Sequence, residues 1–227
     1  ATEPNARVID VAKANKIQVS PKKNIIYLAS LLIGFLVPFG VLYLIFMLDN
    51  KIHSANDVEA ASNKIPILAE IPSLNETENS QMQNKEAFQT LANNTNFITP
   101  YSDQSLGKVI FVTSSIKSEG KTFVSYYLAA AYASLDKKVL LVGADFRNPQ
   151  LRKYLNHNLT ETKGFSNYLH DGTLNWQQLL FQPEDTPYSF DVLLSGTIPP
   201  NPTLLLSNSR FETFMQEAKQ NYDIVII

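Results

Sequence analysis

Hydrophobic positions are densest near the start of the chain, where residues 25–48 run IIYLASLLIGFLVPFGVLYLIFML without a charge. At ~1.5 Å per residue, a helix of this length crosses a ~30 Å hydrocarbon layer with some tilt. A signal peptide has a shorter apolar region and a small-residue cleavage site, which LDNKIHS does not supply. The pattern predicts one transmembrane helix, kinked at Pro38.

A different pattern begins at residue 108, where short apolar runs alternate with helix-like segments. The run KVIFV is typical of a strand and stops at the polar loop TSSIKSEGKT, residues 113–122. The next segment, FVSYYLAAAYASL, has its apolar residues at helical spacing. Strand, loop and helix therefore follow in the order of a phosphate-binding loop, in which the N-terminus of the helix favours an anion.

Three more apolar runs, at 139–142, 189–195 and 222–227, are typical of strands, with helical segments between them. This alternation predicts an α/β fold: a doubly wound parallel sheet with helices on both faces. A sheet that stops at the last run is expected to expose a truncated edge. The aromatic residues expected in the core are Tyr126, Tyr127, Tyr132, Phe165 and Trp176.

The patterns divide the chain into four parts. We expect an extracytoplasmic segment at 1–24, the transmembrane helix at 25–48, a juxtamembrane linker at 49–83 and a P-loop domain at 84–227. Early in the last part, a helix from Lys85 has apolar residues on one face, including Phe88, with which it can dock on the domain.

Composition narrows the function classes. A net charge of -2 argues against a nucleic-acid partner, because no basic stripe is available to neutralise phosphates along a duplex. The chain has no cysteine, which excludes disulfides and thiolate metal sites. Its three histidines, His53, His157 and His170, lack the spacing of metal ligands. The one metal expected is Mg²⁺ carried in with a nucleotide.

The loop at 115–122 supplies the candidate chemistry. In phosphate-binding loops, backbone N–H groups cradle the phosphates, the Lys reaches the β- and γ-phosphates, and the Ser/Thr hydroxyl binds Mg²⁺. Lys121 and Thr122 stand at those positions, but Ser115 replaces the first Gly of the pattern. The structural alternative is an ordinary helix N-terminus; the flanking strand and helix favour the phosphate site.

Five motifs follow one another along the chain: TSSIKSEGKT, VLLVGADFRNPQL, GFSNYL, LLSGTIPPNPTLLL and YDIVII. Taken together, they resemble the bacterial tyrosine kinases of capsule and exopolysaccharide export. Upstream, ARVID, SPKK, the membrane helix and the DVE…IPIL…IP segment resemble the end of a chain-length determinant, or co-polymerase, region. The resemblance covers nearly the whole chain and implies a MinD-like P-loop fold that uses ATP and Mg²⁺.

The resemblance also implies the site residues. The catalytic residues are Lys121, Asp145 and Arg147, and the metal ligands are Thr122 and Asp145. The ATP-binding residues are Ser115, Lys117, Ser118, Glu119, Gly120, Lys121, Thr122 and Phe123.

Three departures from the family pattern affect what the chain is expected to do. Gly143 replaces the first acid of the Walker A′ motif, and Gln89 and Ala92 replace the two arginines of the family's assembly motif. The third acid, of the Walker B motif, and the tyrosine-rich tail would follow Ile227. We therefore expect weak self-assembly, and no tyrosine phosphorylation by this chain unless it is extended past Ile227.

Three functions compete. The first is a membrane-anchored protein-tyrosine kinase that transfers the γ-phosphoryl group of ATP to neighbouring copies and so regulates polysaccharide synthesis and export. The second is a catalytically weak nucleotide-binding scaffold, favoured by the missing acids. The third is a MinD/ParA-like ATPase, which the fused membrane span and Ile116, in place of that group's signature lysine, disfavour.

The kinase interpretation implies a location and partners. We expect the inner membrane, with residues 49–227 in the cytoplasm, although a count of lysines on either side of the span favours the opposite orientation. The expected partners are other copies of the chain, membrane lipid, the polysaccharide export machinery and a cognate phosphatase, with no nucleic acid.

Overall fold

The computed structural model describes residues 21–49, 51–61, 65–72, 78–98, 106–155, 163–184 and 186–227. The chain divides into two compact units, Ala1–Asn63 and Lys64–Ile227. The predicted segment 1–24 lies largely outside the described residues, as do His157 and the loop around it.

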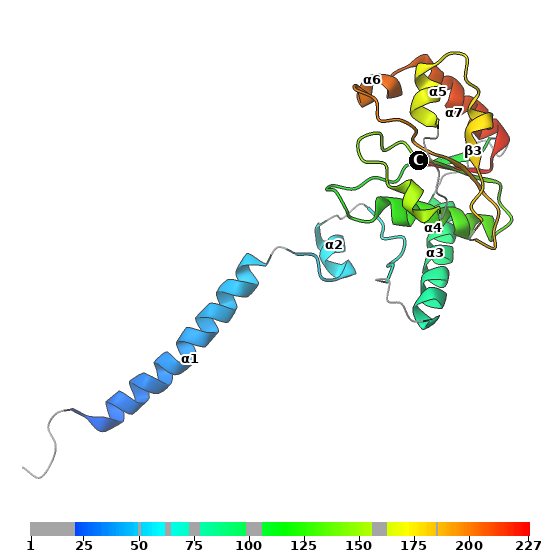
Figure 1. Ribbon diagram of the computed structural model, residues 1–227. Coiled ribbons are helices and arrows are strands. Elements are labelled where there is room, and N and C mark those ends of the chain that lie inside the picture. The colour runs from blue at the N-terminus through cyan, green and yellow to red at the C-terminus, as the bar shows by residue number, and fades with distance from the viewer. Residues whose placement is uncertain are drawn as a thin grey trace, which may run out of the picture. The chain divides into compact units, whose positions relative to one another are not determined.

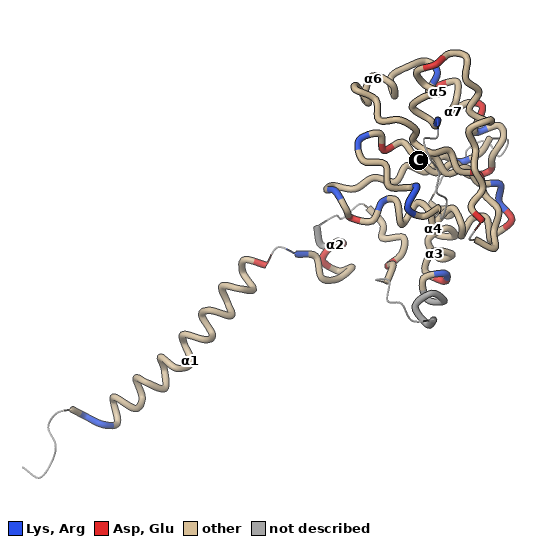
Figure 2. The backbone as a smooth tube through the Cα atoms, viewed as in Figure 1, with Lys and Arg blue, Asp and Glu red and all other residues tan. Residues whose placement is uncertain are grey.

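The first unit contains the long apolar helix α1, Lys23–Leu48, and the short helix α2, Ala55–Ala61 (Figure 1). Every residue of α1 is exposed, and the helix is long and apolar enough to cross a membrane. Figure 2 draws it without charge between a basic segment at its start and an acidic residue at its end. The predicted helix at 25–48 is confirmed and begins two residues earlier, with Pro38 inside it.

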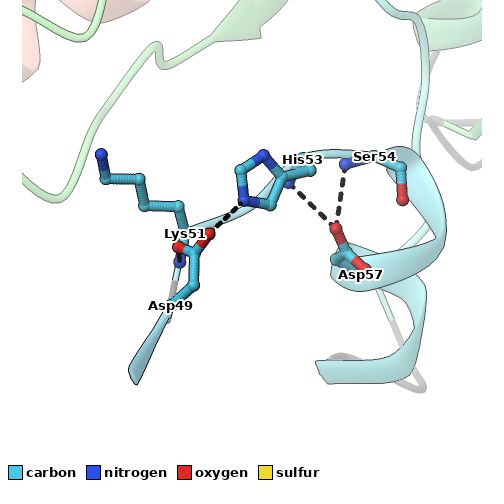
Figure 3. A network of polar contacts seen from close by, with 5 residues as sticks. All are labelled: Asp49, Lys51, His53, Ser54 and Asp57. Atoms are coloured by element: carbon cyan, nitrogen blue, oxygen red, sulfur yellow. Dashed lines mark hydrogen bonds and ion pairs between the residues drawn. The ribbon is translucent and has the colours of Figure 1, made fainter. Parts of the chain in front are cut away.

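A small polar network follows α1 and holds the start of α2 (Figure 3). The Asp49 carboxylate accepts the backbone N–H of Lys51 at 3.1 Å and pairs with His53 Nε2 at 3.0 Å. Asp57 accepts the backbone N–H groups of His53 and Ser54 at 2.9 and 3.0 Å. Because these hydrogen bonds favour the charged form, they hold the pKa of both carboxyls below the usual value.

The second unit is built on a five-stranded sheet of order β1-β5-β2-β4-β3. Its strands are β1 Lys108–Ile110, β2 Val139–Val142, β3 Leu180–Phe181, β4 Asp191–Leu193 and β5 Ile224–Ile226. The neighbouring pairs β1/β5, β5/β2 and β2/β4 are parallel, as predicted. The short strand β3 is antiparallel to β4, so the sheet is mixed. The fold class is confirmed with that correction.

The last strand lies inside the sheet rather than at its edge. β5 pairs with β1 on one side and β2 on the other, and its three residues are buried. The expectation of a truncated edge at the end of the chain was therefore wrong. A crossover connection can insert a late strand between two earlier ones, and here the long helix before β5 provides it.

Helices cover both faces of the sheet, as expected (Figure 1). Alternate strand residues point to opposite faces, so Val139 and Leu141 belong to one core cluster while Leu140 and Val142 belong to the other. Helices α3, Glu78–Ile98, and α4, Lys121–Ala133, cover the first face. The other face is covered by α5, Phe165–His170, and α7, Ser209–Asn221.

The remaining elements are short. They are the 3₁₀ turns η1, Leu151–Tyr154, and η2, Trp176–Leu179, and the helix α6, Pro202–Leu206. Of the five aromatic residues predicted for the core, four are at most 5% exposed, and Tyr127 is half-buried between Phe88 and Phe123. The aromatic core is thus largely as the pattern predicts.

Residues before the predicted domain boundary also pack on the second unit. The Asn94 side-chain amide donates to the Leu68 carbonyl at 2.6 Å, and Ile71 packs against the α3/α4 core. The compact unit therefore includes part of the segment that the sequence assigns to a linker at 49–83. The spacing of hydrophobic residues reports on contacts between neighbours along the chain. It therefore carries little information about whether an extended segment such as 65–72 packs against a helix that follows later in the sequence.

Candidate functional site

The loops that follow the parallel strands meet at one edge of the sheet and enclose a cavity of about 910 Å³. Residues 111–117 line it from the loop after β1, residues 143–145, 147 and 148 from the loop after β2, and Ser195 from the loop after β4. Ligand sites of open α/β sheets lie at this carboxyl edge. The sheet thus brings together the two segments that the sequence analysis selected.

The loop after β1 turns sharply into α4. Ser118 and Gly120 have positive φ angles of 71° and 94°, and Gly120 is the N-cap of α4, which begins at Lys121. Glycine adopts this left-handed conformation without strain, whereas serine does so at a cost. Turns of this kind point successive backbone N–H groups into one concavity, which suits an anion.

Side chains of the loop hold its shape. The Glu119 carboxylate accepts the backbone N–H of Ile116 at 3.1 Å, and the Ser114 hydroxyl donates to the Ile116 carbonyl at 2.8 Å. Lys121 Nζ donates to Ser114 Oγ at 2.9 Å, so the ammonium group lies across the mouth of the loop. The predicted lysine is therefore in the cavity, and Ser114, which the sequence analysis did not select, positions it.

Thr122 and Phe123 occupy the first turn of α4 in different ways. The half-buried Thr122 lines both the main cavity and a smaller one of about 560 Å³ beside it. The Phe123 ring packs on Phe88 and Tyr127, with ring centroids 5.6 and 4.7 Å apart. The Phe123 ring is therefore largely part of the core. Only the backbone N–H of Phe123 and the edge of its ring can contribute to an anion site.

The predicted acid and arginine lie across from the loop. Asp145 Oδ1 accepts the backbone N–H groups of Arg147 and Asn148 at 3.2 and 3.0 Å, which fixes the turn after β2. Asp145 lines both cavities together with Lys121 and Thr122, while Arg147 lines the larger one. The arrangement places the Asp145 carboxylate, the Lys121 ammonium and the Thr122 hydroxyl around a common space.

The other predicted ligands form the outer rim. Ser115, Lys117 and Ser118 are exposed; Ser115 and Lys117 line the larger cavity, and Lys117 and Ser118 line the smaller one. Asn148 and Gln150 line both cavities and were not selected from sequence, because amide side chains in a turn carry no pattern of their own. Ser195 was also missed, since it is 52 positions from Gly143 in sequence and adjacent to it in space.

The oxygen donors present suit a magnesium ion bound with a nucleotide. The described residues contain no cluster of three or more acidic, histidine or cysteine side chains that could hold a metal alone. Mg²⁺ usually keeps several waters and is bound by one or two carboxylates together with substrate phosphates. Asp145 and Thr122 fit that requirement, and they fit it only in the presence of phosphate.

Comparisons with known proteins also indicate a nucleotide-binding kinase. No family model matches the chain. It is 28% identical over 253 residues to the tyrosine-protein kinase etk of Escherichia coli (strain K12), with 98% of this chain and 33% of the relative covered. The solved structure of the chimerical protein CapA2B2 is 30% identical, with a TM-score of 0.62, over 77% of this chain and 74% of that chain. The kinase domain of Escherichia coli tyrosine kinase ETK is 26% identical, with a TM-score of 0.65, over 78% and 72%.

The sheet, the turn into α4 and the shared cavity define a P-loop α/β domain. The similar chains indicate which kind: this protein is similar to bacterial tyrosine-protein kinases. The chain spans about a third of the length of the curated relatives that it matches over nearly its whole length.

Proposed function

We propose that the chain is the membrane-anchored nucleotide-binding part of a protein-tyrosine kinase that acts in polysaccharide synthesis and export. The observation that carries the proposal is the cavity at the N-terminus of α4 that Lys121, Thr122 and Asp145 line together. Similarity to tyrosine-protein kinases adds the reaction class, phosphoryl transfer from ATP to tyrosine.

The chain's own residues would act mainly by positioning and by charge neutralisation. The backbone N–H groups of the loop and the Lys121 ammonium would hold the phosphates, with Lys121 exchanging its bond to Ser114 for one to a phosphate oxygen. Thr122 and Asp145 would hold Mg²⁺, whose charge offsets the charge that develops on the transferred group. Arg147, exposed at the rim, would stabilise the same charge.

In the transfer step, the tyrosine oxygen bonds to the γ-phosphorus as the bond from that phosphorus to the leaving oxygen of ADP breaks. The phenol proton needs an acceptor. Asp145 is the one carboxylate on the described lining of the main cavity, and its Oδ1 already accepts two backbone N–H groups. One carboxylate is poorly placed both to hold the metal and to accept the proton, so a second acid from outside the described residues is expected.

The test compares three proteins incubated with radiolabelled Mg-ATP. They are this chain, a version extended past Ile227 by an acidic residue and a tyrosine-rich segment, and the extended version carrying Asp145→Asn. We expect phosphotyrosine in the extended protein alone. Signal from the unextended chain would refute this account of the site.

The second candidate function is a nucleotide-binding scaffold. It is favoured by Gly143, which leaves the turn after β2 with one acid instead of two. The same proteins separate the candidates when they are also titrated with a fluorescent ATP analogue, because an extended chain that binds nucleotide and makes no phosphotyrosine is a scaffold.

We also propose that α1 anchors the protein in the inner membrane with the P-loop domain in the cytoplasm, where ATP is available. Copies of the chain, lipid, the polysaccharide export machinery and a cognate phosphatase are the proposed partners. Support for the anchor comes from α1, whose residues are all exposed and whose run 25–48 has no charge.

A further inference from the structure

The place of the missing first acid is occupied by a hydroxyl group. A Cβ atom built on Gly143 would lie 2.6 Å from Ser195 Oγ and 3.0 Å from the Ser195 backbone nitrogen. The backbone N–H of Gly143 donates to the Leu193 carbonyl at 2.8 Å, which continues the β2/β4 ladder and sets this juxtaposition. Gly143 and Ser195 thus share a space that holds the side chain of one of them at a time.

The Ser195 side chain is buried and faces the cavity. The residue is 4% exposed and lines the same cavity as Lys121, Thr122 and Asp145. Among the hydrogen bonds of the described residues, none involves its Oγ, although its backbone carbonyl accepts the N–H of Ser166 at 2.9 Å. Ser195 Oγ is not among the fully buried side-chain atoms that lack a partner in the described residues, so this unpaired hydroxyl is open to the cavity. An unpaired hydroxyl open to a ligand cavity points to a ligand or its water as its partner.

Contacts between the segments GFSN and SGT, which lie outside the phosphate-binding loop, hold this serine in place. In the GFSN segment, the Asn167 side chain accepts the backbone N–H of Gly164 at 2.9 Å and that of Thr197 at 3.2 Å. Ser166 Oγ donates to the Thr197 carbonyl at 2.6 Å. The loop after β4 is therefore tied to the start of α5 directly beside Ser195, and a hydroxyl fixed in this way binds without first losing conformational freedom.

Gly164 and Gly196 permit the close approach. A Cβ on Gly164 would meet the Leu194 carbonyl oxygen at 2.3 Å, and Gly196 has a φ of +81°. Larger residues at either position would push the loop away from α5 and move Ser195 with it.

We propose that Ser195 replaces the missing acid, its hydroxyl binding a water of the nucleotide-borne Mg²⁺. This rests on the proposed nucleotide function. A neutral oxygen in place of a carboxylate gives a weaker magnesium site. The position of this oxygen is set by the loop after β4 instead of the loop after β2.

The experiment uses the full chain in detergent and a fluorescent ATP analogue, titrated with Mg²⁺ and, separately, in EDTA. Ser195→Ala should reduce the tightening of nucleotide binding by Mg²⁺ about 2- to 10-fold, the range for loss of one neutral hydrogen bond, and leave binding in EDTA unchanged. Ser195→Thr, which keeps the hydroxyl, should retain the Mg²⁺ effect. Ser207→Ala, an exposed hydroxyl lining neither nucleotide cavity, is the matched control.

A second measurement needs no nucleotide. Gly143→Ala should lower the melting temperature because its Cβ meets Ser195, and Gly143→Ala combined with Ser195→Gly should recover part of the loss, since the Oγ contact is removed. An unchanged melting temperature in Gly143→Ala would refute the inference that Gly143 and Ser195 share one space.

The titration separates this proposal from the proposed function. If wild type binds nucleotide and Ser195→Ala keeps the full Mg²⁺ effect, the magnesium role of Ser195 is refuted and nucleotide binding stands. If wild type binds no nucleotide, both the magnesium role and the proposed nucleotide function are refuted.

Discussion

Replacing Lys121 with methionine tests the nucleotide site most directly. The variant keeps the length of the side chain and removes its charge. Lys121 Nζ already has a partner, Ser114 Oγ at 2.9 Å, and must leave it to reach a phosphate. A hydrogen bond to a charged group contributes about 1.5–3 kcal/mol, and giving up the serine bond makes the lower end appropriate. At about 1.4 kcal/mol per tenfold, affinity should fall at least about tenfold.

The fold should survive this change. A positive charge in the first turn of a helix opposes the helix dipole, so methionine at position 121 does not weaken α4 on that account. The assay is titration of the full chain in detergent with a fluorescent ATP analogue in Mg²⁺. Lys137→Met is the matched control, because it removes the same charge from the exposed turn after α4, at the far end of the helix. Equal affinities for wild type and Lys121→Met would mean that the loop is a structural turn.

Three further predictions concern stability, assembly and topology. Burial raises the pKa of Tyr132 to about 12, so the folded state disfavours ionisation of its phenol. The free energy of unfolding should therefore be highest below the unfolded pKa of ~10 and fall by up to roughly 3 kcal/mol as the pH rises toward 12. Urea unfolding should show a smaller pH dependence of this free energy in Tyr132→Phe. Sedimentation of the full chain in detergent should show monomers at micromolar concentration, because Gln89 and the fully buried Ala92 offer no arginine to a second copy; a stable ring would contradict this. Protease added outside intact spheroplasts should spare residues 49–227, and loss of the P-loop domain would reverse the proposed orientation.

The sequence by itself determined the features that depend on neighbours along the chain. The charge-free run specified α1, because apolar length is enough to choose a membrane-spanning helix. The apolar run before residue 113, the Gly-Lys-Thr turn and the helical spacing after it specified β1, the loop after it and α4. The loop pattern selected Lys121 and Thr122, and the family resemblance added Asp145; these residues follow parallel strands, whose carboxyl ends meet at one edge of the sheet.

Tertiary structure decided what depends on neighbours across the sheet. Strand order is set by crossovers and by which faces the helices bury, so periodicity could not place β5 in the centre or make β3 antiparallel. The Phe123 ring turned into the core because Phe88 and Tyr127 lie beside it. The sequence also could not show that Ser195 lies beside Gly143. Ser195 reaches that position only when β4 pairs with β2 and the loop after β4 is tied to α5. Contacts between residues far apart in sequence are fixed by packing, and a local pattern contains no record of them.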